Sequence, residues 1–206
     1  MARRRWAALA VLATITLAAC TGGATPRTSA NGRVEETTKG ARTIEELSQA
    51  LDINVPSGYS RQPDSVDDTG PSDLEKAVAD DGEDDARDVF TRDHFVRGYQ
   101  REWARSEDDQ IVSYVYQFAD NTGAVDYTKR MTADAGAQTA GVSIDTFTVP
   151  GIAGAVGVNG SDPSFATSTV TFVKGPYSVQ VVVNGTKADG LQSMVTSLAE
   201  EQYSRL

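Results

Sequence analysis

The sequence predicts an α+β fold, an antiparallel sheet of about five strands packed with helices on at least one face. Two pairs of extended runs, rich in valine and aromatic residues, are each joined by a short polar turn. Segments with helical spacing precede, separate and follow these pairs. Strands that arrive in neighbouring pairs indicate antiparallel pairing rather than alternating βαβ units.

Two capping boxes predict helices in the first part of the chain. Thr43-Ile44-Glu45-Glu46 begins a short helix over residues 43–51. Ser72-Asp73-Leu74-Glu75 opens a second helix, with Leu74, Ala77 and Val78 facing inward. The acidic run from Asp80 to Asp88 is expected to interrupt this helix.

Alternation with a period of two predicts the first hairpin. From Phe95 to Trp103, every second side chain points to the same face, and the turn at 106–110 leads into a second strand over 111–118. A third helix is expected over about 121–136, with Ala124 and Tyr127 on its buried side.

The last part of the chain predicts four more extended segments and a closing helix. Two short pieces, 144–149 and 155–158, flank Pro150-Gly151, and a strong hairpin pairs 167–173 with 177–184. In this last strand, Val182 is apolar on the face opposite to Val179, Val181 and Val183, which predicts a central strand covered on both sides. The helix spans 188–203.

The N-terminus has the pattern of a secretory signal. Three arginines (Arg3–Arg5) precede an apolar run that ends in Leu17-Ala18-Ala19-Cys20, and small residues of this kind mark a cleavage site. We predict cleavage between Ala19 and Cys20 and lipidation of Cys20. The alternative is a membrane-spanning helix. Such a helix needs about 20 apolar residues, and the apolar run from Trp6 to Leu17 is shorter. The triple arginine fits both the general and the twin-arginine export routes.

These features divide the chain into a signal peptide (1–19), a lipidated N-terminus with a flexible tether (20–41) and one globular α+β domain (42–206). The tether is rich in Thr, Gly, Ser and Ala and cannot bury enough apolar surface to order itself. We therefore expect a protein anchored to the cell membrane by the lipid on Cys20, with its domain outside the cytoplasm.

The charge of the chain excludes some partners. The whole sequence carries a net charge of −10, and without residues 1–19 it has 16 Lys and Arg against 29 Asp and Glu, a net charge of −13. So negative a domain is not expected to bind nucleic acid or to hold anionic lipid through basic side chains. Cys20 is the single cysteine, and its lipidation leaves no thiol for a disulfide.

Arg97, Tyr99, Arg101 and Trp103 form the candidate binding face. They alternate along the first predicted strand, and arginine with tyrosine and tryptophan is the composition of binding hot spots. The alternative is that the aromatic side chains belong to the core and the arginine stems pack across the sheet.

No catalytic set, cofactor site or metal site is predicted. His94 is the only histidine, and the Gly-x-Ser-x-Gly pattern that would accompany it in a hydrolase is absent. Zinc prefers several Cys and His ligands. The acidic run 80–88 offers oxygen ligands for calcium, but its residues do not follow the order of a calcium-binding loop.

Four segments resemble a group of actinobacterial lipoproteins of unassigned function: Gly98–Trp103, Val115–Asp120, Val149–Ala155 and Glu201–Leu206. The fold is similar, more loosely, to PsbP-like lipoproteins and to the sensor domains of mycobacterial receptor kinases. The resemblance implies an envelope location and an α+β fold, and it brings no catalytic residues. Sensor domains of that type rely on disulfides, which this chain cannot form.

The sequence thus favours a non-catalytic binding or accessory domain at the cell envelope, with an envelope protein or a small ligand as its partner. An envelope hydrolase that uses carboxylates and a carrier of small hydrophobic ligands are the alternatives. A deep cleft with converging carboxylates would favour the hydrolase, and an apolar cavity between helix and sheet would favour the carrier.

Overall fold

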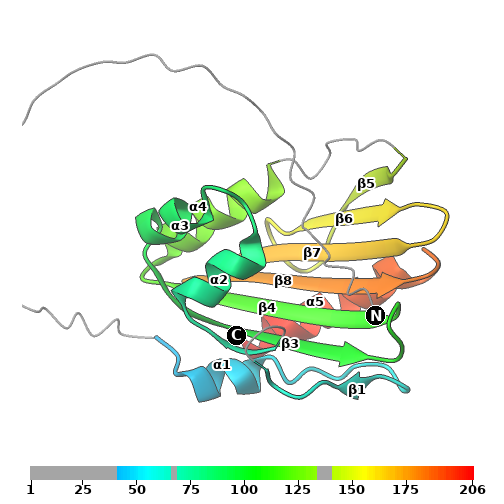
Figure 1. The fold of residues 1–206 in the computed structure, drawn as a ribbon. Coiled ribbons are helices and arrows are strands. Elements are labelled where there is room, and N and C mark those ends of the chain that lie inside the picture. The colour runs from blue at the N-terminus through cyan, green and yellow to red at the C-terminus, as the bar shows by residue number, and fades with distance from the viewer. Residues whose placement is uncertain (1–40, 66–68, 134–140) are drawn as a thin grey trace, which may run out of the picture.

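A computed structural model describes residues 41–65, 69–133 and 141–206 and confirms the α+β class. Its centre is a single antiparallel sheet of eight strands, more than the five predicted, with helices on both faces (Figure 1). The helices are α1 (Ile44–Ala50), α2 (Leu74–Asp81), α3 (Ala86–Arg92), α4 (Asn121–Thr132) and α5 (Leu191–Arg205). The strands are β1 (Ser60–Arg61), β2 (Gly70–Ser72), β3 (Phe95–Ala104), β4 (Gln110–Phe118), β5 (Ser143–Thr148), β6 (Val156–Ser161), β7 (Ala166–Lys174) and β8 (Tyr177–Gly185).

The strand order is β1-β3-β4-β8-β7-β6-β5, and β2 pairs with β3 beside β1. Both predicted hairpins, β3–β4 and β7–β8, are present. Strand β8 lies between β4 and β7 at the centre of the sheet, as the valines on both of its faces indicated. The predicted signal peptide, Cys20 and most of the tether lie outside the described residues.

Two hydrophobic clusters hold the helices to the sheet. Helices α1 and α5 cover one face, where Leu47, Leu198 and the strand residues Val115, Val179 and Val181 are buried. Helices α2, α3 and α4 cover one end of the other face over an aromatic cluster (Figure 1). That aromatic cluster consists of Phe90, Phe95, Tyr116, Phe118 and Tyr127.

A bulge at the start of β3 divides its side chains between the two clusters. The pairing of β3 with β4 shifts between Phe95 and Arg97, and a bulge of this kind re-aims the side chains on either side of it. Phe95 therefore packs in the aromatic cluster, whereas Tyr99 and Trp103 pack on the opposite face. The prediction that Phe95 shares a face with Tyr99 was wrong for this reason.

Helix α2 begins one residue later than its predicted capping box. Asp73 is the N-cap, and its carboxylate accepts a hydrogen bond from the amide of Lys76. Ser72 belongs instead to β2, opposite Gly98, and its hydroxyl is buried. The acidic run does end α2 as predicted, because Gly82 adopts the left-handed conformation that terminates helices. It then continues into α3, a helix that the sequence did not predict.

Within the described ranges, no helix combines the length and the apolar character needed to cross a membrane.

Candidate functional site

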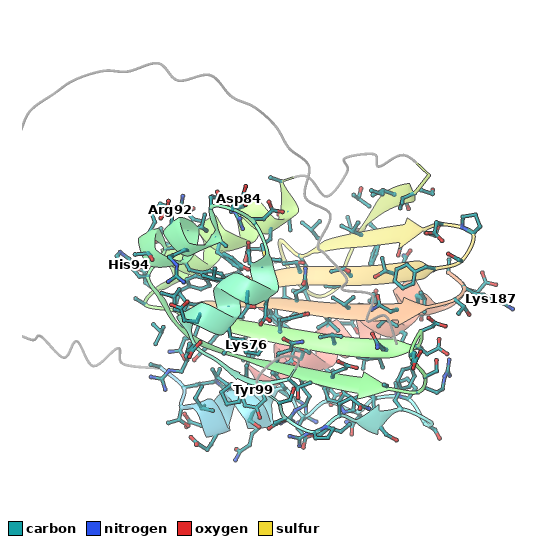
Figure 2. All side chains as sticks on the ribbon, viewed as in Figure 1. Lys76, Asp84, Arg92, His94, Tyr99 and Lys187 are labelled. Carbon is teal, nitrogen blue, oxygen red and sulfur yellow. The ribbon has the colours of Figure 1, made fainter. Side chains whose placement is uncertain are left out.

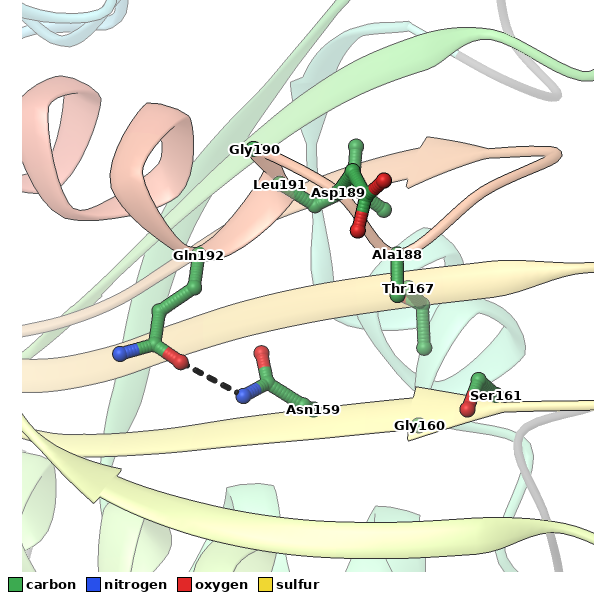
Figure 3. Close-up of a pocket in the computed structure, with 9 residues that line it drawn as sticks. All are labelled: Asn159, Gly160, Ser161, Thr167, Ala188, Asp189, Gly190, Leu191 and Gln192. Atoms are coloured by element: carbon green, nitrogen blue, oxygen red, sulfur yellow. Dashed lines mark hydrogen bonds between the residues drawn. The ribbon is translucent and has the colours of Figure 1, made fainter.

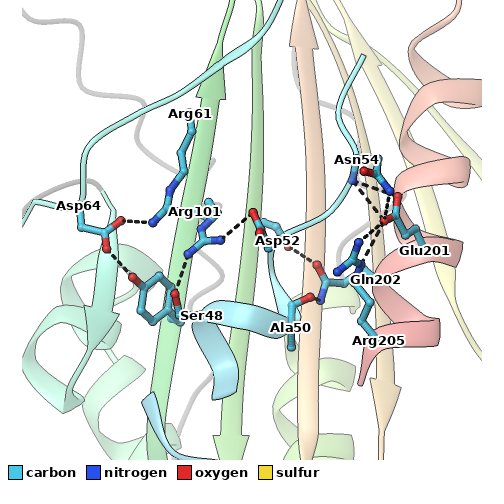
Figure 4. Close-up of polar contacts among 12 residues, drawn as sticks. Ser48, Ala50, Asp52, Asn54, Arg61, Asp64, Arg101, Glu201, Gln202 and Arg205 are labelled. Carbon is cyan, nitrogen blue, oxygen red and sulfur yellow. Dashed lines mark hydrogen bonds and ion pairs between the residues drawn. The ribbon is translucent and has the colours of Figure 1, made fainter. Parts of the chain in front are cut away.

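Three of the four residues of the predicted binding face are buried. Tyr99, Arg101 and Trp103 are 3%, 2% and 4% exposed, and α1 lies across this part of β3 (Figure 4). Arg97 lies two residues before Tyr99, nearer the bulge, and is only partly buried. The burial agrees with the alternative interpretation, in which these side chains belong to the core. Arg97 is the member of the set that a partner can reach without movement of α1.

The guanidinium of Arg101 fastens α1 to the sheet. Its Nη2 donates to the hydroxyl of Ser48 at 2.6 Å, and its Nη1 lies 3.3 Å from a carboxylate oxygen of Asp52. The guanidinium carbon also lies 5.5 Å from the centre of the Tyr99 ring, within the range of a cation–π interaction. The Nε atom is buried and has no partner among the described residues. In this structure, Arg101 therefore serves to hold α1 against the sheet.

Tyr99 extends this polar group to the segment before β2. Its hydroxyl donates to Asp64, which also pairs with Arg61 (Figure 4). The hydrogen bond from Tyr99 is the main reason why the pKa of Asp64 is lowered, and the bond from Arg61 adds to it. Because its lowered pKa keeps Asp64 ionised near neutral pH, Asp64 is not suited to act as a general acid there.

Helices α1 and α5 are joined over the same face of the sheet. The side-chain amide of Gln202 donates to the carbonyl of Ala50 at 2.7 Å and accepts from the hydroxyl of Ser113. In the segment after α1, Asn54 donates hydrogen bonds to the carboxylate of Glu201. Gln117 lies on β4 in the same layer, completely buried, and neither of its amide atoms has a partner among the described residues. Apart from Gln117, these polar groups connect α1, the segment after it, α5 and the sheet.

The acidic run 80–88 is occupied by ion pairs with α4. Asp81 is almost completely buried and accepts hydrogen bonds from Arg130 and from the hydroxyl of Tyr127. Arg130 also reaches Asp85. Burial raises the pKa of Tyr127, and the neighbouring Asp81 raises it further. Two of the carboxylates that the sequence offered to calcium are thus already neutralised by an arginine.

We expect a calcium chelator to leave the melting temperature of the protein unchanged. In the parts of the chain that the structure describes, no group of three Asp, Glu, His or Cys side chains is arranged to hold a metal ion. Thermal unfolding with calcium and with a chelator measures this directly. A marked fall of the melting temperature with chelator would restore the calcium interpretation.

His94 occupies a turn rather than a catalytic arrangement. It lies between α3 and β3 with a positive φ of 58°, and its carbonyl accepts the amide of Ala119. Its side chain is exposed at the end of the molecule that also carries Arg92 (Figure 2). None of the hydrogen bonds found among the described residues joins this imidazole to a serine or threonine hydroxyl, so it does not form the base of a hydrolase triad there.

The surface of the described residues has at least two cavities. The larger of the two, about 350 Å³, lies between the end of β6, the start of β7 and the start of α5 (Figure 3). Asn159, on its wall, donates to Gln192 at 2.8 Å and accepts from Ser168. The other cavity, about 280 Å³, is lined by Gln62, Pro63, Ser65, Thr69 and Glu102. Most of the residues that line these cavities have polar side chains, and neither cavity brings two carboxylates together.

Solved structures with a similar fold include a domain of a receptor kinase. The extracellular domain of PknH from Mycobacterium tuberculosis matches with a TM-score of 0.53 and 13% sequence identity, over 80% of this chain and 98% of that one. At this identity, the similarity concerns the fold alone. No curated protein matches the sequence.

A family model described as "Domain of unknown function (DUF7373) N-terminal" matches residues 34–206, which include the whole sheet and all five helices. The chain therefore belongs to the DUF7373 family.

Proposed function

We propose that this protein is a lipid-anchored, non-catalytic binding or accessory domain that works outside the cytoplasm. The observation that carries the proposal is Leu17-Ala18-Ala19-Cys20, which follows a basic and then an apolar stretch and precedes a polar tether. The fold adds support, because the matching domain of PknH is extracellular. A lipidated Cys20 would carry a diacylglycerol, and two acyl chains provide stable membrane attachment where one does not.

The geometry favours a protein partner over the alternative functions. A carrier of hydrophobic ligands needs an enclosed apolar cavity, whereas both cavities described above are open to the surface and lined mostly by residues with polar side chains. A hydrolase needs paired carboxylates facing a cleft. Among the described residues, the buried carboxylates of the α2–α3 segment are instead held by Lys76 and Arg130. A protein that binds through its surface needs neither feature.

Replacing Cys20 by alanine is expected to release the protein from the membrane. The wild-type protein should partition into the detergent phase of a cell extract, and the variant should move to the aqueous phase, because its acyl chains are lost. Thr21→Ala, a neighbouring change that leaves the cysteine in place, is the matched control. A variant at Cys20 that stays in the detergent phase would contradict the lipid anchor.

The position of the domain is tested separately from its anchor. Protease is added to cells whose outer envelope layers have been removed and whose cytoplasmic membrane is intact. It should digest the wild-type domain while leaving a cytoplasmic marker intact. Protection of the domain under those conditions would contradict the extracytoplasmic location.

A further inference from the structure

The two edges of the sheet differ in how they are protected. On the side of β3, the short strands β1 and β2 cover the edge, and β2 places Pro71 opposite Tyr99. Very short edge strands and proline are common means of preventing a further strand from pairing. This edge is therefore closed to strand addition.

The opposite edge is formed by β5 and has no such protection. Among the described strands, β5 pairs with β6 alone, and their register is uninterrupted over all six residues (Figure 1). The strand contains no proline, lysine or arginine, and four of its side chains are exposed: Ser143, Asp145, Thr146 and Thr148. In an antiparallel ladder, every second residue directs its N–H and C=O away from its partner strand. The outer edge of β5 thus presents donors and acceptors suited to another strand.

This edge is held in place by a contact between β5 and β6. Phe147 lies opposite Gly157, and a Cβ atom on that glycine would come within 2.3 Å of the phenylalanine ring. The ring therefore covers the glycine backbone, an arrangement that fixes the register of a strand pair. Because β5 is held in its register by this contact, a segment that binds its outer edge need not order it first.

The segment of the chain that forms this edge carries no basic side chain. Residues 131–173 contain no Lys, Arg or His, and their acidic residues include Asp145 and Asp162. Asp145 is exposed near the middle of β5, and none of the ion pairs between described residues involves it. A chain with a net charge of −10 adds to this negative potential. Basic side chains are therefore the complement of this edge.

We propose that the outer edge of β5 binds an extended, basic peptide segment of a partner protein by strand addition. The main chain of the segment would complete the ladder, a basic side chain would lie beside Asp145, and β-branched side chains would follow the face of Thr146 and Thr148. The proposal rests on the binding role proposed above and names the class of partner. A second copy of this chain fits less well, because each copy brings Asp145 and a net charge of −10 to the same contact.

A capped peptide, Thr-Lys-Val-Lys-Val-Thr, tests the proposal with the purified full-length protein in detergent. Hydrogen exchange measured by mass spectrometry should show that the peptide slows amide exchange across residues 143–148 by about tenfold at about 1 mM. The same peptide with glutamate in place of lysine should give no protection.

Exchanging the charge on the protein should reverse this preference. With Asp145→Lys, the lysine peptide should lose its effect and the glutamate peptide should gain it, whereas Asp108→Lys in the β3–β4 turn should leave the wild-type preference unchanged. The proposal is overturned if neither peptide protects β5, or if Asp145→Lys does not alter the preference. It is also overturned if the free protein sediments as a dimer with β5 already protected. Because these measurements use purified protein, they are independent of the result for Cys20→Ala.

Discussion

Replacing Phe90 by alanine is expected to lower the free energy of unfolding by about 3–5 kcal/mol, the range for deletion of a fully buried phenylalanine. Phe90 is 0% exposed and joins α3 to the rest of the aromatic cluster. Its ring centre lies 5.0 Å from that of Phe95 and 5.4 Å from that of Tyr116, both in edge-to-face geometry, and 4.8 Å from that of Tyr127. Aromatic pairs add stability beyond the area that they bury.

Urea unfolding followed by tryptophan fluorescence measures the loss, and Phe165→Ala is the matched control. Phe165 is partly exposed in the β6–β7 turn and belongs to neither hydrophobic cluster, so its truncation should cost clearly less. The contacts of Phe90 place the effect at α3 and α4, whose amides should exchange faster in the variant. Equal losses for the two variants would show that the aromatic cluster contributes nothing particular to stability.

The sheet could be predicted because its strands carry local signals. Alternation along β3 and the valine runs of β7 and β8 fit a pleated surface, and the polar turns between them set the hairpins. The placement of β8 at the centre followed from valines on both faces. These signals depend only on residues close in sequence, so contacts with distant parts of the chain do not change them.

The elements that sequence reasoning missed depend on distant contacts. Strands β1 and β2 have two and three residues, too few for a period, and exist because β3 offers them an edge. Helix α3 follows a run of carboxylates that would repel one another in isolation. Arg130, some 45 residues later, pairs with Asp81 and Asp85 and makes that run compatible with two helices. No pattern within residues 80–92 carries this information.

The candidate face illustrates the same limit for the site. Alternation correctly placed Arg97, Tyr99, Arg101 and Trp103 on one side of β3. It could not tell whether that side would be covered. The cover is α1 with the residues that follow it, and Ser48 of α1 and Asp52 just beyond it reach Arg101 across about 50 residues of sequence. The unprotected edge of β5 was likewise invisible, since strand order is a property of the whole sheet.

Arg101→Ala is expected to lower the free energy of unfolding by about 2–4 kcal/mol, because it removes a 2% exposed side chain and leaves a cavity beneath α1. The hydroxyl of Ser48 loses its donor, and Tyr99 loses the cation against its ring. Asp52 is 67% exposed and returns to water, so no buried charge is left behind. Arg97→Ala, on the accessible part of the same strand, should change stability by less than about 0.5 kcal/mol.

Arg101→Met separates the packing of this residue from its charge. Methionine fills much of the volume of the arginine stem, and an apolar replacement of similar size removes the cost of burying a cation, so we expect a loss within about 1 kcal/mol. If Met and Ala are equally damaging, the charge and its contacts to α1 are what stabilise the fold. The opposite outcome is that Arg101→Ala keeps its stability but no longer binds a partner that the wild-type protein binds. In that case α1 moves away from β3 when the partner binds, and the arrangement with Arg101 buried is one of two states of the protein.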